Sequence, residues 1–68
     1  MTEQEVETLE QIWESKTSWG PDREQVLDNL AAGGYIEIIE KRRTSGQIDF
    51  ILVKITDEGI GHISGSAY

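Results

Sequence analysis

The side chains with the clearest chemical potential are three consecutive cations, Lys41, Arg42 and Arg43, which make up half of the six basic residues in the chain. Ammonium and guanidinium groups form charge-assisted hydrogen bonds with phosphate and carboxylate oxygens, so this cluster could hold a nucleic-acid backbone. Charged side chains on an exposed strand also have a structural use, because they discourage the addition of a further strand. The sequence leaves both interpretations open.

Other reactive side chains lack the partners that catalysis or metal binding requires. The single histidine, His62, lies in a glycine-rich segment, and the chain has no cysteine to act as a nucleophile or thiolate ligand. The thirteen carboxylates follow neither a two-histidine motif nor an alternating aspartate loop with a central glycine. We therefore expect no enzyme activity, no cofactor and no metal site.

Charge is distributed unevenly along the 68 residues. Residues 1–40 carry ten acidic and two basic side chains, and residues 41–68 carry three acidic and four basic ones, so the net charges are −8 and +1. A total of −7 repels phosphate at long range, although it leaves a local contact possible. Because no apolar run reaches the ~20 residues of a membrane span and the first residues are acidic, we expect a cytoplasmic protein with no membrane partner.

A β-hairpin organises the expected fold. Residues 35–41 and 47–56 are rich in β-branched and aromatic side chains, and residues 42–46 between them form a polar turn that ends in Ser45-Gly46. The connector around Trp19 could add a short third strand. We expect the Trp19 ring to cover the gap between two helices and its indole N–H to need a partner.

Helix signals lie on both sides of the hairpin. Thr2 and Glu5 form a capping box, and apolar residues at helical spacing continue this helix to about Lys16. A second helix is expected to begin after Asp22 as its cap and to end at Gly33 in the left-handed conformation. After the hairpin, a cap at Thr56 and two glycines predict one or two further helical turns.

Two segments resemble the winged-helix domains of small bacterial and archaeal transcription regulators. Residues 27–38, LDNLAAGGYIEI, are similar to the end of a recognition helix that enters the wing. Residues 55–59, Ile-Thr-Asp-Glu-Gly, are similar to the segment that follows the wing. The resemblance implies an α+β fold with two main helices packed on a β-hairpin wing and a short C-terminal helical turn. We expect one such domain over residues 1–63 and a disordered tail over residues 64–68.

The resemblance also implies a function. The wing of such a domain lies along the minor groove or the phosphate backbone of duplex DNA, which would give Lys41, Arg42 and Arg43 the phosphate contacts of a regulatory protein. Gln25 and Asn29 fall on the outward face of the second helix, and their amides can pair with adenine edges.

An acidic protein-interaction module is the alternative. Strict alternation along the second strand places Ile51, Val53 and Ile55 on one side, and three further apolar residues on the other. Two helices cover only one side, so Ile51, Val53 and Ile55 are expected to form a homodimer or partner interface unless the first helix and the C-terminal turn bury them. The expected core is Val6, Leu9, Ile12, Trp13, Val26, Leu27, Leu30, Ile36, Ile38, Phe50 and Leu52.

Overall fold

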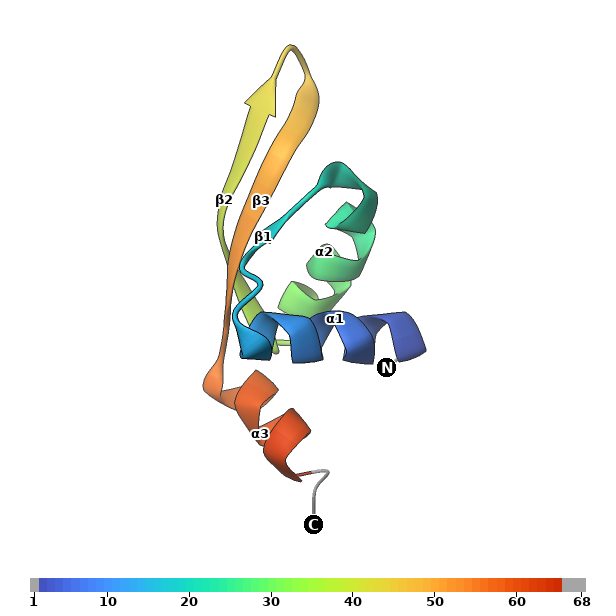
Figure 1. Ribbon diagram of the computed structural model, residues 1–68, viewed down its shortest axis with the longest axis vertical. Helices are drawn as coiled ribbons and strands as arrows, with labels where there is room; N and C mark the ends of the chain where they lie inside the picture. Colours follow the sequence, from blue (N-terminus) through green and yellow to red (C-terminus); the bar gives the residue numbers. More distant parts are fainter. Residues whose placement is uncertain (1, 66–68) are drawn as a thin grey trace.

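The computed structural model describes residues 2–65 and shows an α+β fold in which helices pack on a three-stranded antiparallel sheet (Figure 1). The helices are α1 (Glu3–Glu14), α2 (Glu24–Ala32) and α3 (Asp57–Gly65), with a 3-10 turn, η1 (Pro21–Arg23), directly before α2. The strands are β1 (Ser18–Trp19), β2 (Ile36–Thr44) and β3 (Gln47–Ile55), in the sheet order β1-β3-β2. The short β1 confirms the third strand expected in the connector.

The hairpin is longer than expected because its turn is tighter. Thr44 pairs with Gln47, so only Ser45 and Gly46 connect the strands, with φ angles of 54° and 81°. Positive φ at both central residues matches the right-handed twist of the flanking strands. Residues 42–44, expected in the turn, therefore belong to β2.

Two β-bulges determine which side chains of the hairpin face the helices. Register shifts leave Ile39 in β2 and Asp49 in β3 without a partner in the pairing of the two strands. A bulge places two successive residues opposite one, so the alternation of side chains is reversed beyond it.

The reversal at Asp49 moves the second half of β3 into the core. Ile48 faces the helices before the bulge, and Ile51 and Val53 face them after it, with exposed fractions of 8%, 0% and 1%. Phe50 and Leu52 lie on the opposite side and are only half-buried. The prediction that Phe50 and Leu52 belong to the core is therefore wrong, because strict alternation does not hold across the bulge.

The prediction that Ile51, Val53 and Ile55 form an interface is wrong for the same reason, the reversed alternation beyond Asp49. Ile51 and Val53 are buried inside the monomer, and Ile55 packs against the same core. The helices cover this side, so these three residues form no exposed surface.

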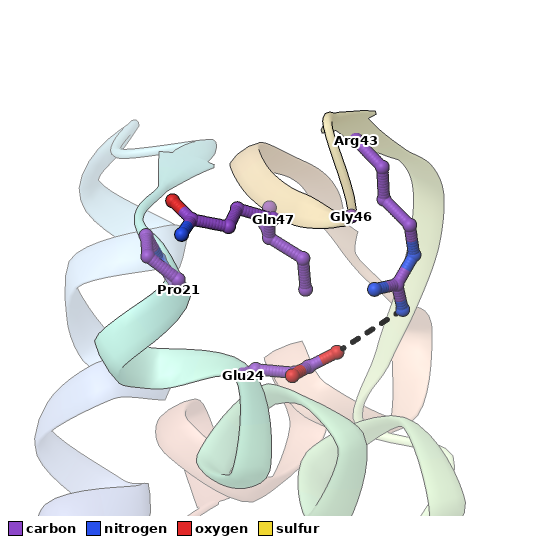
Figure 2. Close-up of a pocket in the computed structure, with 6 residues that line it drawn as sticks. Pro21, Glu24, Arg43, Gly46 and Gln47 are labelled. Atoms are coloured by element: carbon purple, nitrogen blue, oxygen red, sulfur yellow. Dashed lines mark ion pairs between the residues drawn. The ribbon is translucent and has the colours of Figure 1, made fainter.

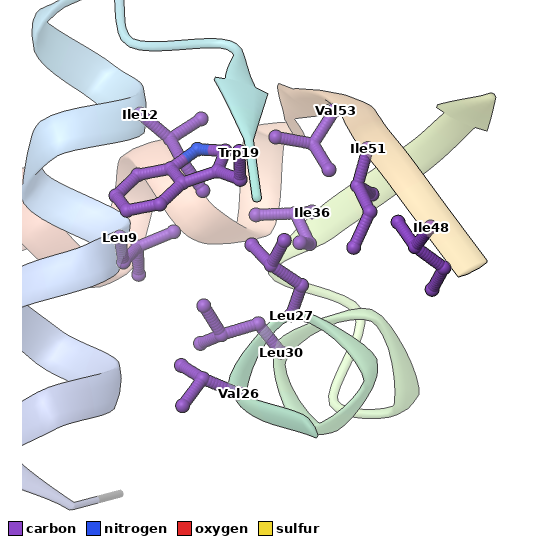
Figure 3. Close-up of a cluster of buried hydrophobic side chains, with 10 residues drawn as sticks. All are labelled: Leu9, Ile12, Trp19, Val26, Leu27, Leu30, Ile36, Ile48, Ile51 and Val53. Carbon is purple, nitrogen blue, oxygen red and sulfur yellow. The ribbon is translucent and has the colours of Figure 1, made fainter. Parts of the chain in front are cut away.

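The core lies between the sheet and the first two helices (Figure 3). Trp19 is 5% exposed and its indole N–H donates to the Lys16 carbonyl oxygen at 2.9 Å, which confirms both its position and its need for a partner. Trp13 is 49% exposed and Val6 is partly buried, so neither belongs to the buried cluster that was expected to include them. The buried apolar residues are Leu9, Ile12, Trp19, Val26, Leu27, Leu30, Ile36, Ile48, Ile51 and Val53.

The predicted start of α1 is confirmed, and both ends of α2 differ from the prediction. The capping box is present, because the Glu5 amide donates to the Thr2 hydroxyl at 3.2 Å and the Thr2 amide donates to the Glu5 carboxylate at 3.0 Å. The hydrogen bond to the backbone of Thr2 is the largest cause of a lowered pKa of Glu5, and the hydrogen bond to the Thr2 side chain also lowers it. Asp22 does not cap α2, because η1 precedes that helix, and Gly34 rather than Gly33 adopts positive φ.

The C-terminal helix is longer than the one or two turns expected. It runs for nine residues to Gly65, so the first two residues of the expected tail are helical. Residues 66–68 of that tail lie outside the described residues. No helix within residues 2–65 has the length and apolar character needed to cross a membrane.

Candidate functional site

The hairpin cations lie on an arm that extends past α2 and gives the molecule its long axis of 46 Å (Figure 1). The bulge at Ile39 directs Lys41 and Arg43 to the helix-facing side, opposite Ile51 and Ile48. Arg42 pairs with Phe50 on the other side of the sheet. The three consecutive cations therefore do not form one surface.

Lys41 is held by two carboxylates of α2. Its Nζ lies 2.8 Å from Asp28 Oδ1 and 3.3 Å from Glu24 Oε2, and its side chain is only 25% exposed. The hydrogen bond to Asp28 is the largest cause of a raised pKa of Lys41, and burial opposes it. This ammonium group is a link between the hairpin and α2 rather than a free phosphate ligand.

Both arginines also have carboxylate partners, but they are more exposed. Arg43 Nη2 lies 3.6 Å from Glu24 Oε2, and Arg42 Nε lies 3.2 Å from Glu40 Oε2. The Arg42 guanidinium carbon lies 5.6 Å from the centre of the Phe50 ring. Their side chains are 59% exposed for Arg42 and 56% for Arg43, so either guanidinium can reach a further ligand.

A cavity of about 310 Å³ lies between η1 and the end of the hairpin (Figure 2). The ion pair between Arg43 and Glu24 spans one wall, and the Gln47 side chain points across the opening toward Pro21. Gly46 and Ile48 complete the lining. Since its cation and carboxylate are paired with each other, the cavity presents no unpaired charge to a ligand.

Gln25 and Asn29, the residues expected to contact bases, are exposed on α2 and bonded to one another. Gln25 Nε2 donates to Asn29 Oδ1 at 3.1 Å. Their neighbours Glu24 and Asp28 hold the two inward-facing cations of the hairpin. The structure therefore places the expected base contacts beside carboxylates.

The single histidine lies beside a tyrosine. The His62 side chain is exposed on α3, and its ring lies 5.2 Å from the Tyr35 ring, centre to centre. Across residues 2–65, no cluster of three or more histidine or carboxylate side chains is placed to hold a metal ion.

The outer face of the sheet, which we define as the side opposite α1 and α2, has other apolar residues than the sequence indicated. Ile39, which the sequence had suggested as part of an uncovered surface, is 60% exposed; Leu52 pairs with the next residue, Glu40, Phe50 pairs with Arg42, and both are half-buried. Alternation had assigned Phe50 and Leu52 to the core. The charged residues of this face are Glu37, Glu40, Arg42, Asp49 and Lys54.

Comparison of the chain with protein-family models, curated proteins and solved structures found no match. The function proposed below therefore depends on the side chains of this chain alone.

Proposed function

We propose that the chain is a protein-interaction module that binds another polypeptide through the outer face of its sheet. The observation that supports this function is the placement of Ile39, Phe50 and Leu52 on the outer face of the sheet, opposite α1 and α2. An exposed aliphatic side chain beside two partly exposed apolar neighbours can mark an interface with a partner. Removing them from water contributes about 25 cal/mol per Å² of apolar surface.

The electrostatics of the hairpin favour this function over nucleic-acid binding. Lys41, Arg42 and Arg43 each have a carboxylate within 4 Å, so phosphate contacts would have to replace existing ion pairs. The net charge of −7 adds long-range repulsion from a phosphate backbone. A protein partner can instead bind the apolar side chains of the outer face.

Site-specific photo-crosslinking in the cells that make the protein tests this function. A benzophenone side chain at Ile39, which is 60% exposed, is expected to form a covalent adduct with a polypeptide under ultraviolet light. The same group at Glu10, exposed on α1, is the matched control and is expected to form none. The absence of any adduct at position 39, both in these cells and in the purified chain at about 1 mM, or equal adducts at both positions, would contradict the proposal.

Duplex DNA binding is the second candidate, and the projecting arm is the observation that favours it. The element order and the sheet order β1-β3-β2 support a winged-helix-like arrangement in which the hairpin is the wing. Arg42 and Arg43 are more than half exposed on this arm. Such an arm can lie along a groove or a phosphate backbone.

For this second candidate, replacing Arg42 and Arg43 with alanine is expected to weaken duplex binding at low salt. Each lost phosphate contact should reduce the slope of log K against log salt by about one unit. Titrations of a labelled duplex by fluorescence anisotropy at several salt concentrations measure both quantities. Lys16→Ala, an exposed cation that follows α1 and is not part of the hairpin, is the control and is expected to bind as the unmodified chain does. Failure of the unmodified chain to bind duplex at low salt would eliminate this function.

A further inference from the structure

We infer that the partner of the outer face is a second copy of this chain, bound face to face about a two-fold axis. This inference rests on the proposed function and names its partner. The argument depends on the signs and positions of the charges that surround Ile39, Phe50 and Leu52.

The charges at the four corners of the outer face alternate in sign. Glu37 and Lys54 are cross-strand partners at the base of the hairpin, with Glu37 Oε2 3.5 Å from Lys54 Nζ. At the other end, Arg42 of β2 is paired with Phe50, beside the bulge residue Asp49 of β3. Going round the face, the signs are therefore negative at Glu37, positive at Lys54, negative at Asp49 and positive at Arg42.

This pattern is complementary to itself. When a second copy is placed on the face by rotation about an axis along the strands, its Glu37 lies over Lys54 and its Arg42 lies over Asp49. When the axis runs across the strands instead, Glu37 lies over Arg42 and Lys54 lies over Asp49. Opposite charges meet in both arrangements, so the face fits a copy of itself in either of the two orientations.

Two outer faces repel each other less than other parts of two copies of the chain would. Each face carries two cations and three carboxylates, a net charge of −1 in a chain of −7. The carboxylate of Glu40, in the middle of the face, lies 3.2 Å from Arg42, whose side chain is 59% exposed and can also meet a carboxylate of the second copy. By contrast, α1 carries the acidic residues Glu3, Glu7, Glu10 and Glu14 and would repel a second copy.

The size of the face predicts a weak dimer. Two paired strands of nine residues span about 30 Å by about 10 Å, and the two residues of β1 add little, so the face offers about 300 Å² per partner. Stable interfaces bury about 800 Å² per partner, and smaller ones are transient. We expect a dissociation constant on the order of 0.1 mM.

Sedimentation velocity of the purified chain between about 10 µM and 1 mM tests the inference. The unmodified chain is expected to change from monomer to dimer over this range. Ile39→Lys, at a position 60% exposed, should weaken the dimer by about tenfold or more without unfolding the chain. Trp13→Lys removes another large exposed side chain, 49% exposed on α1, and is expected to leave the dimer unchanged.

A charge substitution tests the complementarity. Lys54 faces a carboxylate of the second copy in both orientations, so Lys54→Glu is expected to weaken the dimer several-fold. Circular dichroism of each variant verifies that it is folded. A monomer at 1 mM, or a dimer that Ile39→Lys and Lys54→Glu leave unchanged, would overturn the inference.

The two proposals fail in different ways. A chain that is monomeric at 1 mM but forms an adduct at position 39 with a different polypeptide in cells retains the proposed function and loses the inference. A chain that neither dimerises nor forms an adduct loses both.

Discussion

Replacing Val53 with lysine is expected to unfold the chain at 25 °C. Val53 is 1% exposed and contributes to the buried cluster between the sheet and the helices. The substitution removes about 1.5–3 kcal/mol of apolar burial and costs several more to desolvate an unpaired ammonium group. A domain of this size has a free energy of unfolding of only about 3–10 kcal/mol, so the loss is comparable to the total.

The neighbouring position provides the control. Leu52 lies on the outer face and is half-buried, so Leu52→Lys is expected to keep the fold while placing the same charge one residue away. Far-ultraviolet circular dichroism and urea unfolding distinguish the two variants. A Val53→Lys chain that remains a folded monomer would show that the helices do not cover this side of β3.

The contrast between Leu52 and Val53 also shows why the sequence assigned the two faces wrongly. Alternation was applied without interruption from Ile48 onward, and the bulge at Asp49 reverses it. Whether a strand bulges depends on its pairing with the neighbouring strand, which no local pattern in β3 encodes. The prediction that helices leave one apolar side uncovered holds, and only the identity of that side changes.

A bulge also determines which way the hairpin cations point. The bulge at Ile39 directs Lys41 toward Glu24 and Asp28, although these carboxylates are 17 and 13 residues away in the chain. Considered alone, three consecutive cations fit either a phosphate site or a charged exposed strand. Their ion pairs with α2 and with Glu40 depend on tertiary contacts that composition does not reveal.

Features governed by neighbouring residues could be predicted. The capping box at Thr2 and Glu5 joins groups three residues apart, and the Trp19 indole finds its partner in the carbonyl of Lys16. The turn was predicted over residues 42–46, and only its last two residues, Ser45 and Gly46, form it, both with positive φ. In each case the stabilising hydrogen bond or backbone angle lies within a few residues of the pattern that predicts it.

Gly59 occupies the closest approach of backbone to backbone between α3 and the segment after α2. The Thr56 hydroxyl donates to the Gly34 carbonyl oxygen at 2.6 Å and accepts from the Gly59 amide at 3.1 Å. The Thr56 amide donates to the Tyr35 carbonyl oxygen at 3.1 Å. These hydrogen bonds hold the first turn of α3 against the start of β2, with no space for a side chain at position 59.

Replacing Gly59 with alanine is therefore expected to lower the free energy of unfolding by about 2 kcal/mol or more, because overpacking of this kind typically costs about 1–3 kcal/mol. A Cβ at this position would lie 2.1 Å from the Tyr35 carbonyl oxygen and 2.8 Å from Ile55 Cγ1. The carbonyl belongs to the backbone, so the clash is relieved only if α3 moves and the bonds of Thr56 break. A loss of 2 kcal/mol corresponds to a decrease in Tm of about 8–16 °C for a domain of this size.

Gly61→Ala is the matched control in the same helix. The Cβ of this variant would meet no atom within 4 Å, so the helix propensity of alanine should raise the free energy of unfolding by up to about 1 kcal/mol. Thermal unfolding followed by circular dichroism measures both variants, and equal Tm changes would show that α3 does not pack on Tyr35 in this way.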